Sequence, residues 1–155
     1  MHFRIYQASI DDAAGIAGVL RELGWFEPVN QETSAETTER VRRHLYLCLM
    51  DNSHSVFVAR SPEGATIGYI AAHWNPYLFL SGPEGYISEL FVHPEYRGQG
   101  IGTQLLEIVQ KEARQRGCYR LMLINNRTRQ SYLLGFYEKN GWVERPQMAN
   151  FIYKL

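Results

Sequence analysis

The stretch LFVHPEYRGQGIGTQLLEIV, Leu90 to Val109, places three alternating glycines between an apolar run and a segment with helical periodicity. Glycine lowers stability in and beside helices, so its use at the start of a helix needs a physical reason. A helix N-terminus presents unpaired N–H groups and the positive end of the helix dipole, and glycine lets a charged anion reach them. Gly98, Gly100 and Gly102, with the Arg97 side chain, therefore predict a pyrophosphate cradle. A tight turn between a strand and a helix is the alternative, and the glycine spacing alone fits both.

Two other kinds of phosphate-binding loop do not fit this stretch. A Walker A loop requires Gly-Lys followed by Ser or Thr, which the sequence lacks. The dinucleotide fingerprint requires G-x-G-x-x-G in the first strand-helix-strand unit and an acidic residue after the next strand. Here the spacing is G-x-G-x-G, the loop lies late in the chain, and Asn125 and Asn126 follow the next expected strand.

Composition and charge limit the class of protein. The chain has 155 residues, 45% of them hydrophobic and 21% charged, which predicts a single folded domain over residues 1–155. Lys+Arg and Asp+Glu balance at 16 each, so no net field is expected to attract nucleic acid or an anionic membrane. Neither a membrane span nor a signal peptide is predicted. Cys48 and Cys118 lie in apolar patterns without CxxC spacing, as expected of reduced thiols in the cytoplasm.

Apolar periodicity and turn residues predict strands that alternate with helices. The expected strands cover residues 2–8, 55–60, 65–74, 85–92, 119–125, 141–145 and 150–155. The expected helices cover 9–24, 33–49, 101–117 and 131–141, with a loop at 25–34. The strand at 119–125 must run parallel to the strand at 85–92, because a helix separates them. This order predicts an α/β fold of the mixed, α+β kind, with helices on both faces of one sheet.

These residues carry a resemblance to a known family. The segment RGQGIG, residues 97–102, resembles the Q/R-x-x-G-x-G/A loop of the GNAT superfamily, the acyl-CoA-dependent N-acyltransferases. The preceding LFV at 90–92 and the downstream FYEKNG at 136–141 follow in the family's order, and the resemblance extends over residues 66–143. It implies a mostly antiparallel central sheet of about seven strands, in which the fourth strand has a bulge and splays from the parallel fifth.

The resemblance implies acetyl-CoA as co-substrate and no metal ion. The Val92 main chain is expected to pair with the pantetheine amides, and the Leu90 N–H to stabilise the oxyanion of the attacked thioester. Gln130 stands where many family members contact the cofactor through an asparagine, so Asn125 and Asn126 are expected to take over that contact. The residues implied in cofactor binding are Leu90, Phe91, Val92, Arg97, Gly98, Gln99, Gly100, Ile101, Gly102, Thr103 and Asn126.

Three side chains are implied in catalysis. Tyr137 resembles the family's general acid, which assists CoA as it leaves as a thiolate; a core aromatic with its hydroxyl at the surface is the alternative. Glu89 is a candidate general base for the amine, although strand alternation also permits it to face a helix or solvent. His73, on the neighbouring strand, is the second candidate base, or else a hydrogen-bonded strand residue.

The expected acceptor cleft is lined by Trp25, Phe26, Trp74 and Tyr77, whose rings suit an amine with apolar character. The aromatic stretch at 74–86 equally fits a homodimer surface. The resulting hypothesis is a cytoplasmic N-acetyltransferase that transfers an acetyl group from acetyl-CoA to a primary amine by direct attack on the thioester. A small-molecule amine is expected rather than a protein amine. A non-catalytic acyl-CoA-binding or sensing domain of the same fold is the alternative, and a pure interaction domain is a third class.

Overall fold

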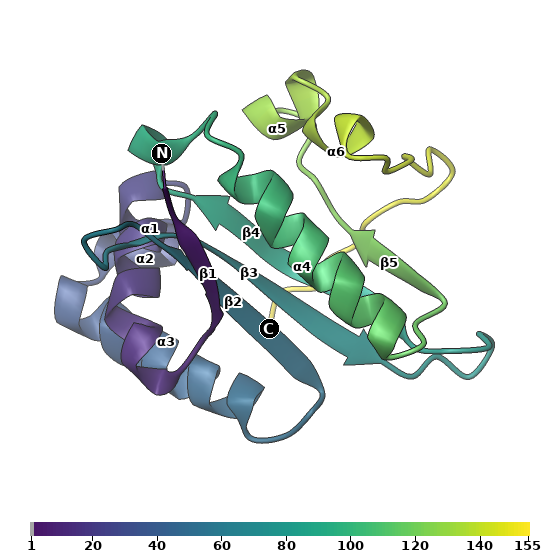
Figure 1. Cartoon of the computed structure of the whole chain (residues 1–155), viewed down its shortest axis with the longest axis horizontal. Helices are drawn as coiled ribbons and strands as arrows, with labels where there is room; N and C mark the ends of the chain where they lie inside the picture. The colour runs from purple at the N-terminus through teal and green to yellow at the C-terminus, as the bar shows by residue number, and fades with distance from the viewer. Residues whose placement is uncertain (1) are drawn as a thin grey trace. The chain divides into compact units, whose positions relative to one another are not determined.

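The computed structural model describes residues 2–155 and divides them into two compact units, one ending at Leu123 and the other formed by Ile124–Leu155 (Figure 1). The first unit contains a sheet of five strands, in the order β1 (Arg4–Gln7), β2 (His54–Arg60), β3 (Thr66–Asn75), β4 (Glu84–Val92) and β5 (Arg120–Leu123). Within the described part of the chain, every helix is too short or too polar to cross a membrane.

Strand directions in this sheet follow the sequence pattern. β1 to β4 pair antiparallel in succession, and β5 runs parallel to β4, so the mixed sheet and its parallel pair are confirmed. The expectation of about seven strands is not: five are found among residues 2–155, and none at 141–145 or 150–155. Val143, Phe151 and Ile152 are 88%, 91% and 78% exposed. These apolar side chains are therefore not buried, and burial is what makes strand pairing favourable for such residues.

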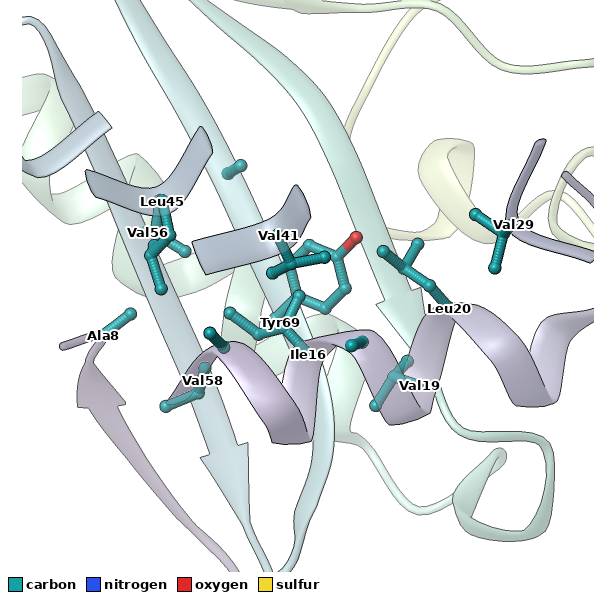
Figure 2. Packing of buried hydrophobic residues seen from close by; sticks show 13 residues of the cluster. Ala8, Ile16, Val19, Leu20, Val29, Val41, Leu45, Val56, Val58 and Tyr69 are labelled. Carbon is teal, nitrogen blue, oxygen red and sulfur yellow. The ribbon is translucent and has the colours of Figure 1, made fainter. Parts of the chain in front are cut away.

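Helices of the first unit cover both faces of the sheet. α1 (Ala13–Leu23) and α3 (Ser34–Leu49) lie on the side of Val56, where one buried cluster joins them to β2 and β3. Ser55 points the other way, and its Oγ donates to Oε1 of Glu112 in α4 (Ile101–Gln115) at 2.8 Å. Since successive strand residues point to opposite faces, α4 covers the second face. Figure 2 shows the cluster on the first face, with α1 and α3 side chains around the Tyr69 ring.

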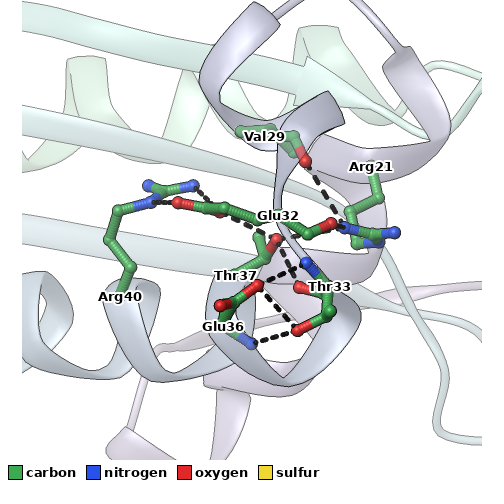
Figure 3. Close-up of polar contacts among 7 residues, drawn as sticks. All are labelled: Arg21, Val29, Glu32, Thr33, Glu36, Thr37 and Arg40. Carbon is green, nitrogen blue, oxygen red and sulfur yellow. Dashed lines mark hydrogen bonds and ion pairs between the residues drawn. The ribbon is translucent and has the colours of Figure 1, made fainter.

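Local sequence signals set the ends of the two longer helices on that first face. α1 ends at Gly24, whose backbone is left-handed (φ 66°), a conformation that favours glycine. α3 begins after Thr33, whose N–H donates to Glu36 Oε2 at 2.7 Å, while the Glu36 N–H donates to Thr33 Oγ1 at 3.2 Å (Figure 3). This reciprocal capping box confirms the helix start predicted from the sequence.

A short helix, α2 (Glu27–Gln31), occupies part of the segment expected to be a loop. Arg21, from the preceding helix, donates through Nη1 to the carbonyl oxygens of Val29 at 3.4 Å and Glu32 at 2.8 Å (Figure 3). The Val29 oxygen also accepts from the Glu32 N–H at 3.3 Å, so Arg21 adds side-chain hydrogen bonds at the C-terminal end of α2. The loop prediction was wrong because the contact that stabilises the helix comes from another element.

The second unit contains two short helices, α5 (Gln130–Leu133) and α6 (Phe136–Lys139), where the sequence pattern predicted one helix over 131–141. Gly135 separates them, because its backbone is left-handed at φ 63°. A left-handed residue cannot continue a right-handed helix.

Candidate active site

β4 is paired on both sides along its first half and on one side along its second half. Its ladder with β5 ends at the pair Ile87–Leu123. On the other side, pairing with β3 continues to Val92, with Ser88 inserted as a bulge. A bulge bends a strand and disturbs its ladder, and here it follows directly on the last pair with β5. The bulge expected of the fourth strand is therefore confirmed, and the ladder with the fifth strand ends directly before it. The side of Ser88–Val92 that faces away from β3 is called the free edge below.

Hydrogen bonds to β3 show which main-chain groups face the free edge. The His93 N–H donates to the Ile67 oxygen at 2.9 Å, which makes Gly68–Val92 a pair that exchanges no hydrogen bonds. Residues of such a pair direct their N–H and C=O groups away from each other. The main chains of Val92 and, two residues earlier, Leu90 therefore point to the free edge. This is the orientation that pantetheine pairing and oxyanion stabilisation would need.

The glycine loop joins the end of β4 to α4 and has the backbone of an anion-binding turn. Gly98 and Gly100 are left-handed, at φ 74° and 82°, and a Cβ at either would meet no described atom within 4 Å. The first helical hydrogen bond runs from the Gln104 N–H to the Gly100 oxygen at 3.0 Å. The N–H groups of residues 101–103 precede that bond, and the first turn carries no acidic side chain. The open space beside the glycines, the N–H groups of residues 101–103 and the positive end of the helix dipole all favour the binding of an anion.

Arg97 folds back from this loop onto two other elements. Its Nε donates to the Val92 oxygen at 3.3 Å, and its guanidinium carbon lies over the Trp25 ring, 5.3 Å from the centroid. The Val92 oxygen faces the free edge, so Arg97 supplies the kind of bond that a neighbouring strand would otherwise donate. The side chain expected to bind phosphate thus also contacts protein groups at the end of β4.

Glu89 lies on the sheet face covered by α1 and α3. It is paired in register with Ala71, and Phe91 with Tyr69, and both β3 partners belong to the cluster beneath those helices. Residues directly opposite in a ladder share a face, so Glu89 shares this one. Burial raises the pKa of the Glu89 carboxyl, and the Tyr69 hydroxyl and Arg40 guanidinium partly offset that rise. A raised pKa makes the carboxylate a stronger base than an ordinary glutamate.

Arg40 is itself held in place by a polar network at the start of α3. Its Nε and Nη2 donate to the two carboxylate oxygens of Glu32 at 2.8 and 3.0 Å. Thr37 Oγ1 donates to Glu32 Oε2 at 2.9 Å (Figure 3). A bidentate arginine–carboxylate pair fixes the guanidinium plane. The positive charge that acts on Glu89 therefore comes from a fixed position and is already partnered by one carboxylate.

His73 lies on the same face of the sheet, beside the bulge. Its Nε2 is 2.8 Å from Ser88 Oγ, and its ring centroid is 4.5 Å from that of His54 on β2. Burial, and secondly the neighbouring His54, lower the pKa of His73, which keeps the imidazole neutral at pH 7. His73 is thus a hydrogen-bonded strand residue that contacts the bulge, and its role as a base remains a prediction.

Two of the four residues expected to bind the acceptor lie together near the free edge. Trp25 and Phe26 meet Phe91 edge-on, with ring centroids 6.0 and 5.5 Å from that of Phe91. Trp25 is 37% exposed. This group of three rings, called the aromatic rim below, lies on the Glu89 face, because Phe91 and Glu89 are two positions apart on β4.

The other two expected acceptor residues lie elsewhere in the unit. Trp74 is buried, and its Nε1 donates to Ser55 Oγ at 2.9 Å on the face covered by α4. Tyr77 lies in the loop between β3 and β4 and packs against Phe79 at 5.7 Å. That loop adjoins the first residue of β4, roughly 20 Å along the strand from Phe91. The structure therefore does not bring Trp74 or Tyr77 to the aromatic rim.

The second unit contains the expected general acid. The Tyr137 ring lies 5.0 Å from that of Phe136 and 6.2 Å from that of Trp142. Burial raises the pKa of Tyr137 to about 12, so the phenol keeps its proton at neutral pH. Asn126 caps a local turn, with its Oδ1 accepting from both the N–H and the Oγ of Thr128 at 2.9 Å. The catalytic role of Tyr137 and the cofactor contact of Asn126 remain predictions.

A sequence model described as the Acetyltransferase (GNAT) family matches residues 19–142. The chain belongs to this family. Thialysine N-epsilon-acetyltransferase of Bos taurus is 28% identical over 125 residues, covering 77% of this chain and 72% of the relative. Glucosamine 6-phosphate N-acetyltransferase 1 of Oryza sativa subsp. japonica is 29% identical over 140 residues, covering 87% and 77%. The two GNAT relatives are named for different acceptors, so family membership does not identify the acceptor of this chain.

Solved structures support the same fold. A transcriptional regulator from Bacillus halodurans C-125 superposes with a TM-score of 0.82 at 23% identity, over 99% of this chain and 100% of that one. At this identity the likeness shows the fold alone.

Sequence reasoning missed two contacts of this GNAT site and the exact place of a third feature. The resemblance implied a bulge in the fourth strand, but its position at Ser88 has no signal in the strand pattern, because an inserted residue keeps the same apolar composition. The proximity of Tyr69 and Arg40 to Glu89 depends on which face Glu89 occupies, which alternation alone left undecided. The contact of Arg97 with Trp25 joins residues far apart in the chain. An arginine next to the glycine loop was its only sequence signal.

Proposed function

We propose that this GNAT family member is an N-acetyltransferase that transfers an acetyl group from acetyl-CoA to a primary amine. The observation that carries the proposal is the free edge of β4, which leads directly into the glycine loop of α4. Pantetheine amides would pair with the main chains of Leu90 and Val92, as a further strand would. The pyrophosphate would bind the N–H groups of the loop. Residues 90–92 and 97–103 form the part of the proposed donor site that lies in the first unit.

The chemistry needs few side chains. The amine nitrogen bonds to the thioester carbonyl carbon while the carbonyl electron pair moves to oxygen, where the Leu90 N–H stabilises the charge. Glu89 accepts the proton that the amine loses, directly or through water, and its raised pKa suits that task. Collapse of the intermediate then breaks the C–S bond. Tyr137 donates its proton to the departing thiolate, leaving CoA and the N-acetylated amine.

The acceptor is proposed to be a small-molecule amine with an apolar body. The aromatic rim offers partly exposed rings on the face of the sheet that carries Glu89. Such rings bind apolar groups and are attracted to cations. Two relatives, at 28% and 29% identity, are named for thialysine and glucosamine 6-phosphate, which favours a small molecule over a protein amine.

The test is a panel of primary amines incubated with acetyl-CoA, with free-thiol release followed over time and acetylated products identified by mass spectrometry. The panel should contain matched pairs, such as an arylalkylamine and the alkylamine of equal length. Reactions without amine measure hydrolysis of the thioester. Calorimetric titration with CoA is run in parallel. Tight CoA binding without turnover of any amine would favour a non-catalytic acyl-CoA-binding domain, and absence of CoA binding would overturn the proposal.

A further inference from the structure

One side chain, Arg97, contacts both the proposed donor edge and the proposed acceptor rim. Its Nε donates to the Val92 oxygen at 3.3 Å, on the free edge of β4. Its guanidinium carbon lies 5.3 Å from the centroid of the Trp25 ring, which in turn meets the Phe91 ring at 6.0 Å. The chain between Trp25 and Arg97 contains β2, β3 and β4. The contact between these two side chains therefore joins two connections that are far apart in sequence.

Both contacts of Arg97 are ones that substrates of the proposed reaction would use. A pantetheine amide paired with the free edge would donate its N–H to the same Val92 oxygen. A primary amine is protonated in neutral solution, because its pKa is close to that of lysine. Such a cation is attracted to the face of a tryptophan ring, as the Arg97 guanidinium is. Arg97 therefore stands where a donor N–H and an acceptor cation would each bind.

We propose that Trp25 recognises the cationic group of the acceptor, and that Arg97 covers Trp25 until the donor takes the Val92 oxygen. The proposal rests on the proposed function. Donor binding replaces the bond from Arg97 to Val92 with one from an amide, and the guanidinium moves to the donor phosphates beside Gly98. The Trp25 face is then open to an ammonium group, which loses one proton to water before its nitrogen attacks the thioester. This selects amines that carry a positive charge and no phosphate, because a phosphate would repel the electron-rich ring face.

If the donor displaces Arg97 in this way, an exchange of one bond for another, the effects of Trp25 and Arg97 substitutions on CoA affinity should depend on each other. We would measure the CoA dissociation constant by calorimetry for the wild type, Trp25→Leu, Arg97→Ala and the double variant. Trp25→Leu removes the attraction that holds Arg97 over the ring, so CoA should bind about 2–5-fold more tightly, the range of one exposed cation–π contact. In the Arg97→Ala background the same change should have no effect. Trp25→Leu should also raise KM for a cationic amine while kcat changes little.

A matched control exists on the far edge of the sheet. Tyr6 is 41% exposed, and the Arg60 guanidinium lies 5.1 Å from its ring centroid. Tyr6→Leu therefore removes a similar contact away from the site and should leave both the CoA affinity and KM unchanged. Trp25→Phe keeps a ring with a weaker π face and should shift the CoA affinity in the same direction by less, which covers the case in which Trp25→Leu does not fold.

The outcomes separate this inference from the proposed function. Weaker CoA binding in Trp25→Leu, or an equal change in both Arg97 backgrounds, would overturn the exchange and make Trp25 a structural residue. A wild type that acetylates amines but shows no coupling would overturn this inference alone. A wild type that does not bind CoA would overturn the proposed function, and the exchange with it.

Discussion

The two halves of β4 differ in what surrounds them. In the first half, Glu84 and Ile87 are 2% and 3% exposed, and β3 and β5 pair on either side. Glu84 also forms an ion pair with Arg120 on β5. In the second half, Ser88–Val92 has a ladder on one side only, and its side chains are partly exposed. A strand thus gains an unpaired main-chain edge when it loses a neighbour, and its side chains need not change in character.

This difference predicts two kinds of mutational effect. Changes in the first half should lower stability, because every group there is packed or hydrogen-bonded on both sides. Changes in the second half should lower binding or catalysis while the fold stays intact, because its main chain is only half used by the sheet.

The largest expected effect comes from Glu89, in the second half. Glu89→Gln keeps the shape and removes the base, so kcat/KM should fall by about 10²–10⁴-fold. Glu89 must be ionised to act and its pKa is raised, so wild-type kcat/KM should fall, as pH is lowered, at a pH above the usual range of a glutamate. In Glu89→Gln that acidic limb should flatten. The measurement is the pH profile of kcat/KM.

Two controls make this prediction specific. CoA affinity should be unchanged in Glu89→Gln, since no part of the main chain is altered. Glu107, an exposed residue of α4, offers the same substitution at a site without a proposed role, and Glu107→Gln should keep the wild-type profile. If Glu89→Gln also kept that profile, the role of base would move to His73 or to ordered water.

A second large effect is expected from outside β4, because the free edge supplies no acid for the leaving group. Tyr137→Phe removes one oxygen and keeps the ring, so kcat should fall by roughly 10²-fold with CoA affinity nearly unchanged. The loss should be smaller with an acyl donor whose thiol is more acidic. Tyr153 is 89% exposed, and Tyr153→Phe serves as the control in the same unit. Equal losses with both donors would indicate that Tyr137 positions the donor only.

Features set by local chemistry were predictable from the sequence. The capping box of Thr33 and Glu36 and the left-handed Gly24 define helix ends through contacts within a few residues. The parallel fourth and fifth strands followed from the helix between them. The number of strands could not be predicted from the sequence. The apolar residues after 141 would form strands only by pairing with an edge of the sheet, and composition does not show whether they pair.

The candidate site was predictable where its function lies in the main chain. A glycine loop and an LFV strand identify backbone groups whatever their side chains touch. The structure places the main chains of Leu90 and Val92 on the free edge, and their binding roles remain predictions. The side chains that line the proposed acceptor site were harder to predict. Trp25 lies in the connection between α1 and α2, where it joins the aromatic rim, whereas Trp74 lies in β3 and donates to Ser55 on the opposite face. Which face of the sheet a β3 side chain occupies depends on strand register, and the position of Trp25 depends on helix packing.

The first half of β4 should respond to a single added methyl group. A Cβ at Gly85 would lie 2.7 Å from Trp74 Cζ3 and closer still to Leu121, so Gly85→Ala should lower the free energy of unfolding by about 1–3 kcal/mol. The measurement is chemical denaturation. Gly18, on the exposed side of α1, has open space around it, and Gly18→Ala should raise stability by up to about 1 kcal/mol. A Gly85→Ala protein of unchanged stability would contradict the tight packing of this half.

The smallest expected effect tests the loop that follows the second half, and it compares two glycines of similar backbone. Gly100 at φ 82° and Gly64 at φ 89° are both left-handed, and an added Cβ at either would meet no described atom within 4 Å. Gly100→Ala and Gly64→Ala should therefore lose similar stability, roughly 1–2 kcal/mol, from the cost of a left-handed alanine. Only Gly100→Ala places a methyl group where the proposed pyrophosphate meets the N–H groups of α4. Its CoA affinity should fall about tenfold, near the low end for one hydrogen bond to a charged group, while Gly64→Ala binds as the wild type does. Equal CoA affinity in the two variants would make Gly100 a turn residue and nothing more, and the flexible start of α4 would then serve the change of direction between strand and helix.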